Sequence, residues 1–419
     1  MHNTITARRS AGSLILAAIV ALVFVDYAPA GGAGESEPAS PALSAGAMQS
    51  AGALEFGPDG VLFIGDSYEA KVFALETNDT AAPAMPEAPV LVERIDIELA
   101  ALLGADPIDV VINDMAVNPA SQNVYLTVHV GRTTNPGVAL ARFVKDSGEL
   151  EILDLSAFEM TSVDIPMAPA FEETLQYGQS ERMLAVTDLT YYDGELLIAG
   201  VSNQEFESTL RRVSYPFTDD MVISSIEIFH GAHNQQETHA PIVTSLVYEI
   251  QGEPHLIAGY ACSPLVKIRL SDLEDGAHVL GTTMAELGYG NAPVDIFVYQ
   301  PHPLLGGGGE RILVTNDQRG ATSVDTALFA EAELTEGSFF PIGLDQSAQP
   351  LTGALHADPL NDTFLVTVRR NVQTGYLNLN SVPMGLWFDA AETIVEMNWP
   401  DRDDSPAGTP NPIDYGFEG

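Results

Sequence analysis

A unit made of a strand, a tight turn and two further strands recurs along most of this chain and limits the folds available to it. In residues 186–213, an apolar strand leads through Asp193 and Gly194 into a more hydrophobic strand, and an alternating strand follows. Asp-Gly between two apolar runs is a strong signal for a two-residue β-hairpin turn. The same order of elements occurs in six stretches: 53–75, 114–144, 186–213, 244–270, 294–329 and 353–379.

These repeats predict an all-β chain folded as a single β-propeller. A unit of this size cannot bury both faces of its own sheet, whereas units stacked around an axis cover one another and expose only short edges. We expect six four-stranded antiparallel blades. The long stretch 157–186 leaves seven blades open, and a pair of β-sandwiches is the rival fold. Candidate fourth strands lie at 90–97, 150–156, 224–231, 279–287 and 393–399.

The units resemble the NHL and SMP-30 superfamily of β-propellers, through stretches such as FGPDGVLFIGDSYEAKVFAL at 56–75. The resemblance covers nearly all of the chain after its N-terminal segment. It implies that ligands collect on one face, where the chain enters each innermost strand and leaves each second strand. It also implies a catalytic divalent ion, because SMP-30-like lactonases and paraoxonases use one to polarise an ester or lactone carbonyl.

The N-terminal 30 residues have the composition of a secretory signal peptide. Arg8 and Arg9 precede an apolar run that is short for a membrane span, and Ala28 to Ala30 offer a small-residue cleavage site. We therefore expect a periplasmic or secreted protein, exported by the general or the twin-arginine route, with no stable membrane span after signal removal. The expected domains are a signal peptide (1–30), a flexible linker rich in Gly, Ala, Ser and Pro (31–52), the propeller (53–400) and a C-terminal tail (401–419).

The charge of the chain is strongly negative. There are 58 Asp and Glu against 17 Lys and Arg, a formal net charge of −41. Such a surface repels phosphate groups, which excludes nucleic acid as a partner and favours a small-molecule or cell-envelope ligand. Cys262 is the only cysteine, so the chain has no internal disulfide.

Oxygen-bearing side chains at the expected ligand face suggest a hard cation. Carboxylate and amide oxygens from several blades are the ligands that calcium prefers. The candidates for this site are Asp66, Asp114, Asn203, Asp295 and Asn316. The alternative is that they cap strand ends and form local turn hydrogen bonds.

A cluster of histidines suggests a softer metal. His230, His233 and His239 lie within ten residues of one another, Cys262 lies at the next connection on this face, and His129 lies two blades away. Imidazole and thiolate together suit copper or zinc. The alternatives are loop histidines that bind backbone and an inert, buried thiol.

Other polar residues at the same face are candidates for substrate binding. In so acidic a chain, Arg319, Arg369 and Arg370 at second-strand ends could receive a carboxylate by paired hydrogen bonds. Alternatively, they pair with neighbouring acidic side chains. The further candidates at strand entrances are Asp114, Asp188, Glu237 and Asn291.

The predicted function is a metal-dependent hydrolase of the lactonase or esterase type, with catalytic residues left unassigned. The chain has no G-x-S-x-G elbow, P-loop, haem-attachment or H-E-x-x-H motif. The alternatives are a non-catalytic propeller that binds a cell-envelope ligand or protein, and a copper- or quinone-dependent redox enzyme.

Overall fold

The computed structural model describes residues 48–131, 137–174, 180–288, 291–302, 308–316, 320–371 and 373–386. All of them belong to one compact unit of the chain, 37–419. The predicted signal peptide, the predicted tail and the candidate strand at 393–399 lie outside the described residues, as does most of the predicted linker.

Four sheets contain four antiparallel strands each. The first sheet consists of β1 (Leu54–Phe56), β2 (Val61–Asp66), β3 (Lys71–Glu76) and β9 (Met160–Asp164). The second consists of β5 (Val110–Val117), β6 (Val124–Val130), β7 (Gly137–Val144) and β8 (Glu149–Ile152). The third consists of β19 (Pro293–Tyr299), β20 (Arg311–Asn316), β21 (Thr322–Asp325) and β23 (Gln346–Ala348). The fourth consists of β24 (Ala354–Pro359), β25 (Phe364–Arg370), β26 (Leu377–Pro383) and β4 (Leu91–Val92).

A ten-stranded sheet contains two antiparallel runs whose last strands, β13 and β18, pair in parallel. One run is β10 (Asp188–Tyr192), β11 (Glu195–Val201), β12 (Ser208–Ser214) and β13 (Met221–His230). The other is β15 (Ile242–Ile250), β16 (Glu253–Tyr260), β17 (Pro264–Arg269) and β18 (His278–Glu286). Two short strands complete it, β14 (Gln235–Glu237) beside β13 and β22 (Ile342–Gly343) beside β18.

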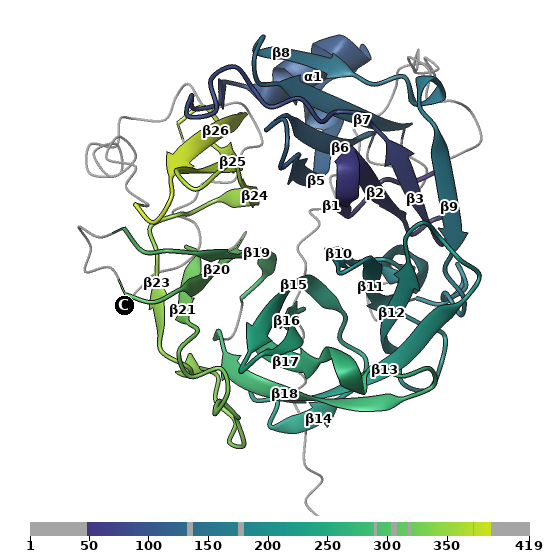
Figure 1. The fold of residues 1–419 in the computed structure, drawn as a ribbon, viewed down its shortest axis with the longest axis vertical. Coiled ribbons are helices and arrows are strands. Elements are labelled where there is room, and N and C mark those ends of the chain that lie inside the picture. The colour runs from purple at the N-terminus through teal and green to yellow at the C-terminus, as the bar shows by residue number, and fades with distance from the viewer. Residues whose placement is uncertain are drawn as a thin grey trace, which may run out of the picture. The chain divides into compact units, whose positions relative to one another are not determined.

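The sheets have a propeller arrangement, with their first strands innermost (Figure 1). Each of β1, β5, β10, β15, β19 and β24 contacts two others of this set, so that these strands surround a common axis. The predicted all-β class, the propeller arrangement and the four-stranded antiparallel sheets are confirmed.

The predicted hairpin at Asp193-Gly194 is confirmed. These two residues connect β10 to β11 with φ angles of 47° and 85°. Gln251 and Gly252 connect β15 to β16 in the same way, with φ angles of 54° and 82°. Positive φ at both central positions matches the right-handed twist of the flanking strands, which is why Asp-Gly signals this turn.

Two of the fourth strands differ from the sequence prediction. The stretch 90–97 supplies only β4, which pairs with β26 near the other end of the described chain, and then forms helix α1 (Ile95–Leu103). The first sheet is completed instead by β9, from the stretch 157–186. Local periodicity identifies a strand but does not say which sheet edge it joins, and this explains the difference. The strands predicted at 150–156, 224–231 and 279–287 are present as β8, β13 and β18.

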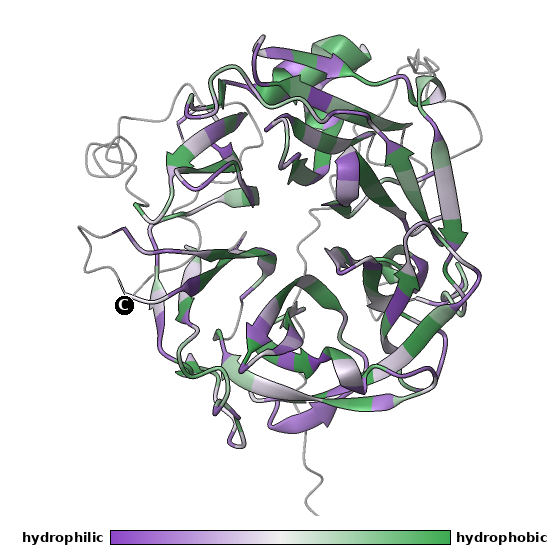
Figure 2. Cartoon of the chain, viewed as in Figure 1, coloured by the Kyte–Doolittle hydropathy of each residue, from purple (hydrophilic) through white to green (hydrophobic). Residues whose placement is uncertain are grey.

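The hydrophobic core is divided among the contacts between neighbouring sheets. Side chains of β2 and β3 pack against β10 and β11, for example, and α1 covers the contact between β5–β7 and β25–β26. In Figure 2 the blade strands and α1 carry long hydrophobic stretches, whereas β14 is hydrophilic. No helix in the described part of the chain has the length and apolarity needed to cross a bilayer.

Candidate functional site

Acidic side chains recur on the first strands, which surround the axis. Five of the six first strands carry a half-buried carboxylate: Glu55 on β1, Asp114 on β5, Asp188 on β10, Asp295 on β19 and Asp358 on β24. They are close enough that the charges of Asp358, Asp188 and Asp114 raise the pKa of Glu55, in addition to the larger effect of burial. The first strands therefore form an acidic axial region.

These carboxylates also join neighbouring sheets. Four of them accept a hydrogen bond from a backbone N–H on an adjacent first strand. The fifth, Asp188, accepts a hydrogen bond from the Ser245 hydroxyl of β15 at 2.5 Å. The backbone bonds are Leu54 N to Asp114 at 2.6 Å, Tyr191 N to Glu55 at 3.0 Å, Ala357 N to Asp295 at 2.7 Å and Val117 N to Asp358 at 2.7 Å. Part of the function of the axial acids is thus structural.

His356 on β24 lies beside two of these carboxylates. Its Nε2 donates to the Ile112 carbonyl at 3.2 Å, whereas its buried Nδ1 has no hydrogen-bond partner and lies 3.5 Å from Asp114 Oδ1. The His356 residue is only 8% exposed. Ligand atoms of Asp114, Asp295 and His356 all lie within 4.8 Å of one another. We refer to these three residues as the axial cluster.

Burial and neighbouring charges shift the pKa values of the axial cluster. Burial raises the pKa of Asp295 well above its usual value. Burial lowers the pKa of His356, but the nearby carboxylates of Asp114 and Asp295 outweigh it, so the net shift is upward. A proton on His356 or a metal ion would compensate an ionised carboxylate, and the Nδ1, which makes no hydrogen bond, fits either.

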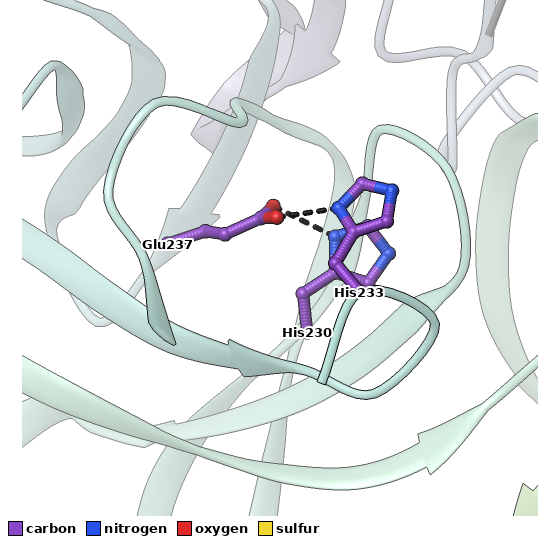
Figure 3. A group of neighbouring side chains, drawn as sticks. All are labelled: His230, His233 and Glu237. Atoms are coloured by element: carbon purple, nitrogen blue, oxygen red, sulfur yellow. Dashed lines mark hydrogen bonds and ion pairs between the residues drawn. The ribbon is translucent and has the colours of Figure 1, made fainter. Parts of the chain in front are cut away.

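A second cluster lies where β13 passes through a turn into β14. Glu237 bridges two histidines: His230 Nδ1 is 2.7 Å from Oε2, and His233 Nδ1 is 2.5 Å from Oε1 (Figure 3). The two imidazole rings lie 4.0 Å apart between centroids. These three residues, which we call the hairpin cluster, also have ligand atoms within 4.8 Å of one another.

Ion pairing determines the electrostatics of the hairpin cluster. Burial lowers the pKa of His230, but hydrogen bonds to Cys262 and Glu237 outweigh it and raise the pKa to about 10. Burial raises the pKa of Glu237, but bonds from His230 and His233 outweigh it and lower the pKa to about 2. At neutral pH the carboxylate is therefore ionised and His230 is protonated.

Two of the predicted metal ligands anchor the segment that precedes β1. Asp66 is fully buried and accepts Gln49 N and the Ser50 hydroxyl, both at 2.7 Å. His129 accepts Ala51 N at 3.4 Å, and burial lowers its pKa to about 4. Neither residue belongs to the axial or the hairpin cluster.

Three other predicted ligands are not among the converging ligand atoms of either cluster, although Cys262 hydrogen-bonds His230. Asn203 is exposed and accepts a hydrogen bond from Gln204 at 2.7 Å. The Nδ1 of His239 lies 3.1 Å from Oε2 of Glu207. Cys262 has a φ of 86°, and its thiol lies 3.7 Å from the Ser263 hydroxyl.

The remaining predicted residues are engaged in the fold. Asn316 and Asn291 are buried and hydrogen-bond each other through their side chains. Arg369 donates twice to the Thr352 carbonyl, at 3.0 and 3.1 Å, and Arg370 donates to Gly375 O at 2.7 Å. Arg319 lies outside the described residues. Asp114 and Asp295 belong to the axial cluster, His233 and Glu237 to the hairpin cluster, and Asp188 to the axial acids.

The sequence interpretation did not include Glu55, His356 and Asp358. A signal for them exists, because an acidic residue recurs in the first strand of five units: LEF, VVINDMAV, DLTYY, PVDIFVY and ALHADP. In the last of these, His356 and Asp358 are two residues apart and so face the same side of a strand.

A surface cavity of about 330 Å³ lies elsewhere, between Met167, Phe206, Ile223 and Asp275. None of its lining residues belongs to either cluster.

Comparisons with known proteins give no family. No family model matches the sequence, and no curated protein matches it. Virginiamycin B lyase from Staphylococcus aureus is similar at 6% identity and a TM-score of 0.33, over 80% of this chain and 95% of that one. A glucose dehydrogenase is similar at 11% identity and a TM-score of 0.32, over 80% and 96%. A chain of a mitotic checkpoint complex is similar at 10% identity and a TM-score of 0.32, over 86% and 98%.

Proposed function

We propose that this protein is an exported six-bladed propeller and a metal-dependent hydrolase of the esterase or lactonase type, with its metal centre at Asp114, Asp295 and His356. One observation carries the proposal: the buried Nδ1 of His356 lacks a hydrogen-bond partner and lies beside two carboxylates on neighbouring first strands. A buried polar atom without a hydrogen bond is costly, so its presence here favours a ligand.

The count of six treats the ten-stranded sheet as two blades. Its two runs each begin with an innermost strand, β10 or β15, and the parallel pairing of β13 with β18 joins only their outer edges. With the four separate sheets, this division gives each of the six first strands a blade of its own. It also follows the sequence repeats.

The ligand set favours zinc or manganese over the calcium suggested by the sequence. Calcium takes six to eight oxygen ligands, whereas an imidazole with two carboxylates suits a transition metal. Each ligand is held by a second contact: His356 by Ile112 O, Asp114 by Leu54 N and Asp295 by Ala357 N. Such outer contacts fix the direction of the ligand atoms.

The chemistry that we propose combines this centre with a nearby acid. A divalent cation, when bound, supplies Lewis acidity to an ester or lactone carbonyl. Burial raises the pKa of Asp188 to about 7, and Ser245 holds one of its oxygens. A carboxyl group that is partly ionised near neutral pH can take a proton in one step and return it in another.

Metal analysis with a hydrolysis assay tests the proposal. The full-length chain, purified without chelator, is analysed for metal and assayed against aryl esters and lactones before and after EDTA, with Zn²⁺, Mn²⁺ or Ca²⁺ restored. We expect hydrolysis that EDTA abolishes and that Zn²⁺ or Mn²⁺ restores. In His356→Ala, we expect axial metal affinity and the metal-dependent rate to fall by roughly 100-fold or more.

His255→Ala is the matched control. His255 is also a buried histidine, 7% exposed, and its Nδ1 contacts the carbonyl of Glu253 at 2.9 Å. It belongs to neither cluster, so this variant should retain metal and activity. Equal metal content in both variants would exclude the axial centre, and bound metal without hydrolysis of any ester or lactone would leave a binding propeller.

Export is tested separately. The N-terminus of the protein recovered from a cell that exports it should begin near residue 31 if the predicted signal peptide is removed. An uncleaved chain that stays in the cytoplasm would contradict export without affecting the metal centre.

A further inference from the structure

The hairpin between β13 and β14 places three metal-binding side chains within eight residues. In the β13–β14 ladder, His230 is paired with Gln235 and Ile228 with Glu237. His230 and Glu237 therefore project on the same side of the ladder as diagonal neighbours. The turn, closed by His233 N to His230 O at 3.2 Å, brings the second imidazole to the same carboxylate (Figure 3).

The cluster is graded from buried to exposed. The side chain of His230 is 2% exposed and that of Glu237 15% exposed, whereas that of His233 is 36% exposed. Two ligands are thus held rigidly by the fold, and the third faces solvent. An ion could reach this site from the surface and keep coordination positions open to water.

The neighbouring β18 braces the turn. Glu286 at the end of β18 is fully buried; it accepts hydrogen bonds from Gly231 N and the Ser263 hydroxyl. A Cβ at Gly231 would lie 2.8 Å from the Glu286 side chain, so this close contact requires glycine. Ser263 also lies 3.4 Å from His230 Nε2, on the side of the ring opposite to Glu237. The ligand directions are therefore preorganised by a second layer of contacts.

We propose that this hairpin binds a first-row transition-metal ion, zinc or copper(II), through His230 Nδ1, His233 Nδ1 and a carboxylate oxygen of Glu237. Two imidazoles and one carboxylate are a donor set that both ions accept. Without metal, the imidazole N–H groups donate to the carboxylate, so metal binding displaces these protons to solvent and weakens as pH falls. The site is independent of the axial cluster.

This assignment differs from the sequence interpretation, which also offered Cys262, His239 and His129 as ligands of this site. The Cys262 thiol is not among the converging atoms, and His239 is paired with Glu207. Glu237, which the sequence suggested as a substrate-binding residue, takes their place. Cys262→Ser and His239→Ala are therefore controls that should retain the metal.

Zinc binding in a His356→Ala background tests the site without the axial centre. We expect about one equivalent of zinc per chain by equilibrium dialysis and metal analysis at pH 7.5, and a loss of affinity of roughly 100-fold when His233→Ala or Glu237→Gln is added. Circular dichroism and urea unfolding confirm that each variant is folded. If His356→Ala does not fold, the same comparison in the wild-type chain should show the loss of about one equivalent on His233→Ala.

Copper(II) provides a second measurement. The electron paramagnetic resonance spectrum of the copper-loaded His356→Ala protein should show coupling to two imidazole nitrogens, and His233→Ala should reduce this to one. His239→Ala should leave the spectrum unchanged. Zinc affinity that is unchanged by His233→Ala, or a folded His356→Ala protein that binds no zinc, would overturn the proposal.

Discussion

The axial cluster and the hairpin cluster use similar side chains but are assembled in different ways. Asp114, Asp295 and His356 come from strands of three different sheets, far apart in sequence. His230, His233 and Glu237 lie within eight residues on one hairpin. The first cluster exists only when the propeller is assembled, whereas the second needs one hairpin and the brace from Glu286.

The two clusters also differ in their hydrogen bonding. In the hairpin cluster, Glu237 takes both histidines as partners, so the group is internally satisfied. In the axial cluster, the carboxylates accept backbone N–H groups of other strands, and His356 Nδ1 lies 3.5 Å from Asp114 without forming a hydrogen bond. The axial cluster therefore combines two tasks, joining sheets and presenting ligand atoms, and substitutions can separate them.

Asp295→Asn should separate these tasks with the largest effect. The amide oxygen can still accept Ala357 N–H, so the contact between β19 and β24 is kept, but the charged ligand is lost. We expect axial zinc affinity to fall by roughly 100-fold while the hairpin site is unchanged. Isothermal titration of the variant measures both sites. Asp295→Ala should in addition lower the free energy of unfolding by about 1–3 kcal/mol, because it leaves the Ala357 N–H unpaired.

The second largest effect should be a difference in the pH dependence of stability between the axial region and the hairpin cluster. The pKa of Asp188 is about 7 in the folded protein against an ordinary 3.8. Its stabilising contribution is complete below about pH 4 and is lost as pH rises through 7, since the unfolded chain ionises first. We expect the free energy of unfolding of the metal-free chain to fall by about 1–3 kcal/mol from this group between pH 4 and 8.

Urea unfolding in chelator over this pH range measures the effect. Asp188→Asn should flatten the plot of the free energy of unfolding against pH. Asp362→Asn, at an exposed position, should shift this plot without changing its slope. The hairpin cluster should show the opposite pH dependence. The pKa of Glu237 is about 2, so the stabilisation that this carboxylate gives is complete above pH 4.5 and is lost as pH falls through 2. A curve for Asp188→Asn parallel to that of the wild type would contradict the assignment.

Gly231→Ala should have a smaller effect, confined to the hairpin. The added methyl would displace the Glu286 side chain from the turn. We expect the zinc affinity of the hairpin to fall by about tenfold, as is typical when an outer contact is lost, and the axial affinity to stay the same. Dialysis in the His356→Ala background measures the zinc affinity of the hairpin site. Titration in a His233→Ala background measures the zinc affinity of the axial site.

His239→Ala should have the smallest effect. This histidine is largely exposed and its ion pair with Glu207 is at the surface, so we expect less than about 1 kcal/mol in stability. Zinc affinity at both sites should change by less than about twofold. A larger loss of zinc, measured by the same dialysis, would show that the hairpin site extends to this residue.

The sequence predicted the repeated part of the fold well and the assembled contacts less well. Asp-Gly turns and alternating strands are local signals, so the hairpin at Asp193 and the sheets built from the repeats were predictable. The partners of β4 and β9 were not, because nothing local specifies which distant edge a short strand joins. Helix α1 had a signal that was not used, the spacing of Ile95, Leu99 and Leu103, which are all buried in the structure.

The candidate sites also divide into a part with a local sequence signal and a part that depends on contacts between distant strands. The uneven distribution of histidines indicated the hairpin, although the sequence alone favoured Cys262 over Glu237. At the axis, Asp114 and Asp295 were among the candidates, but His356 was not, because its importance depends on which strand lies beside β5. Asp66 and Asn316 have the right chemistry for ligands and yet form hydrogen bonds that hold other segments of the fold.

The pairing of β4 with β26 has a consequence for biosynthesis. Leu91 and Val92 leave the ribosome nearly three hundred residues before their partners Asn380 and Leu379. The sheet that contains β24, β25 and β26 can be completed only after residue 380 has left the ribosome, so the edge of β4 must wait unpaired in the nascent protein. A chaperone or a slow step at this stage would act on that edge, and shortening the chain before β26 would leave every earlier blade in an unclosed assembly.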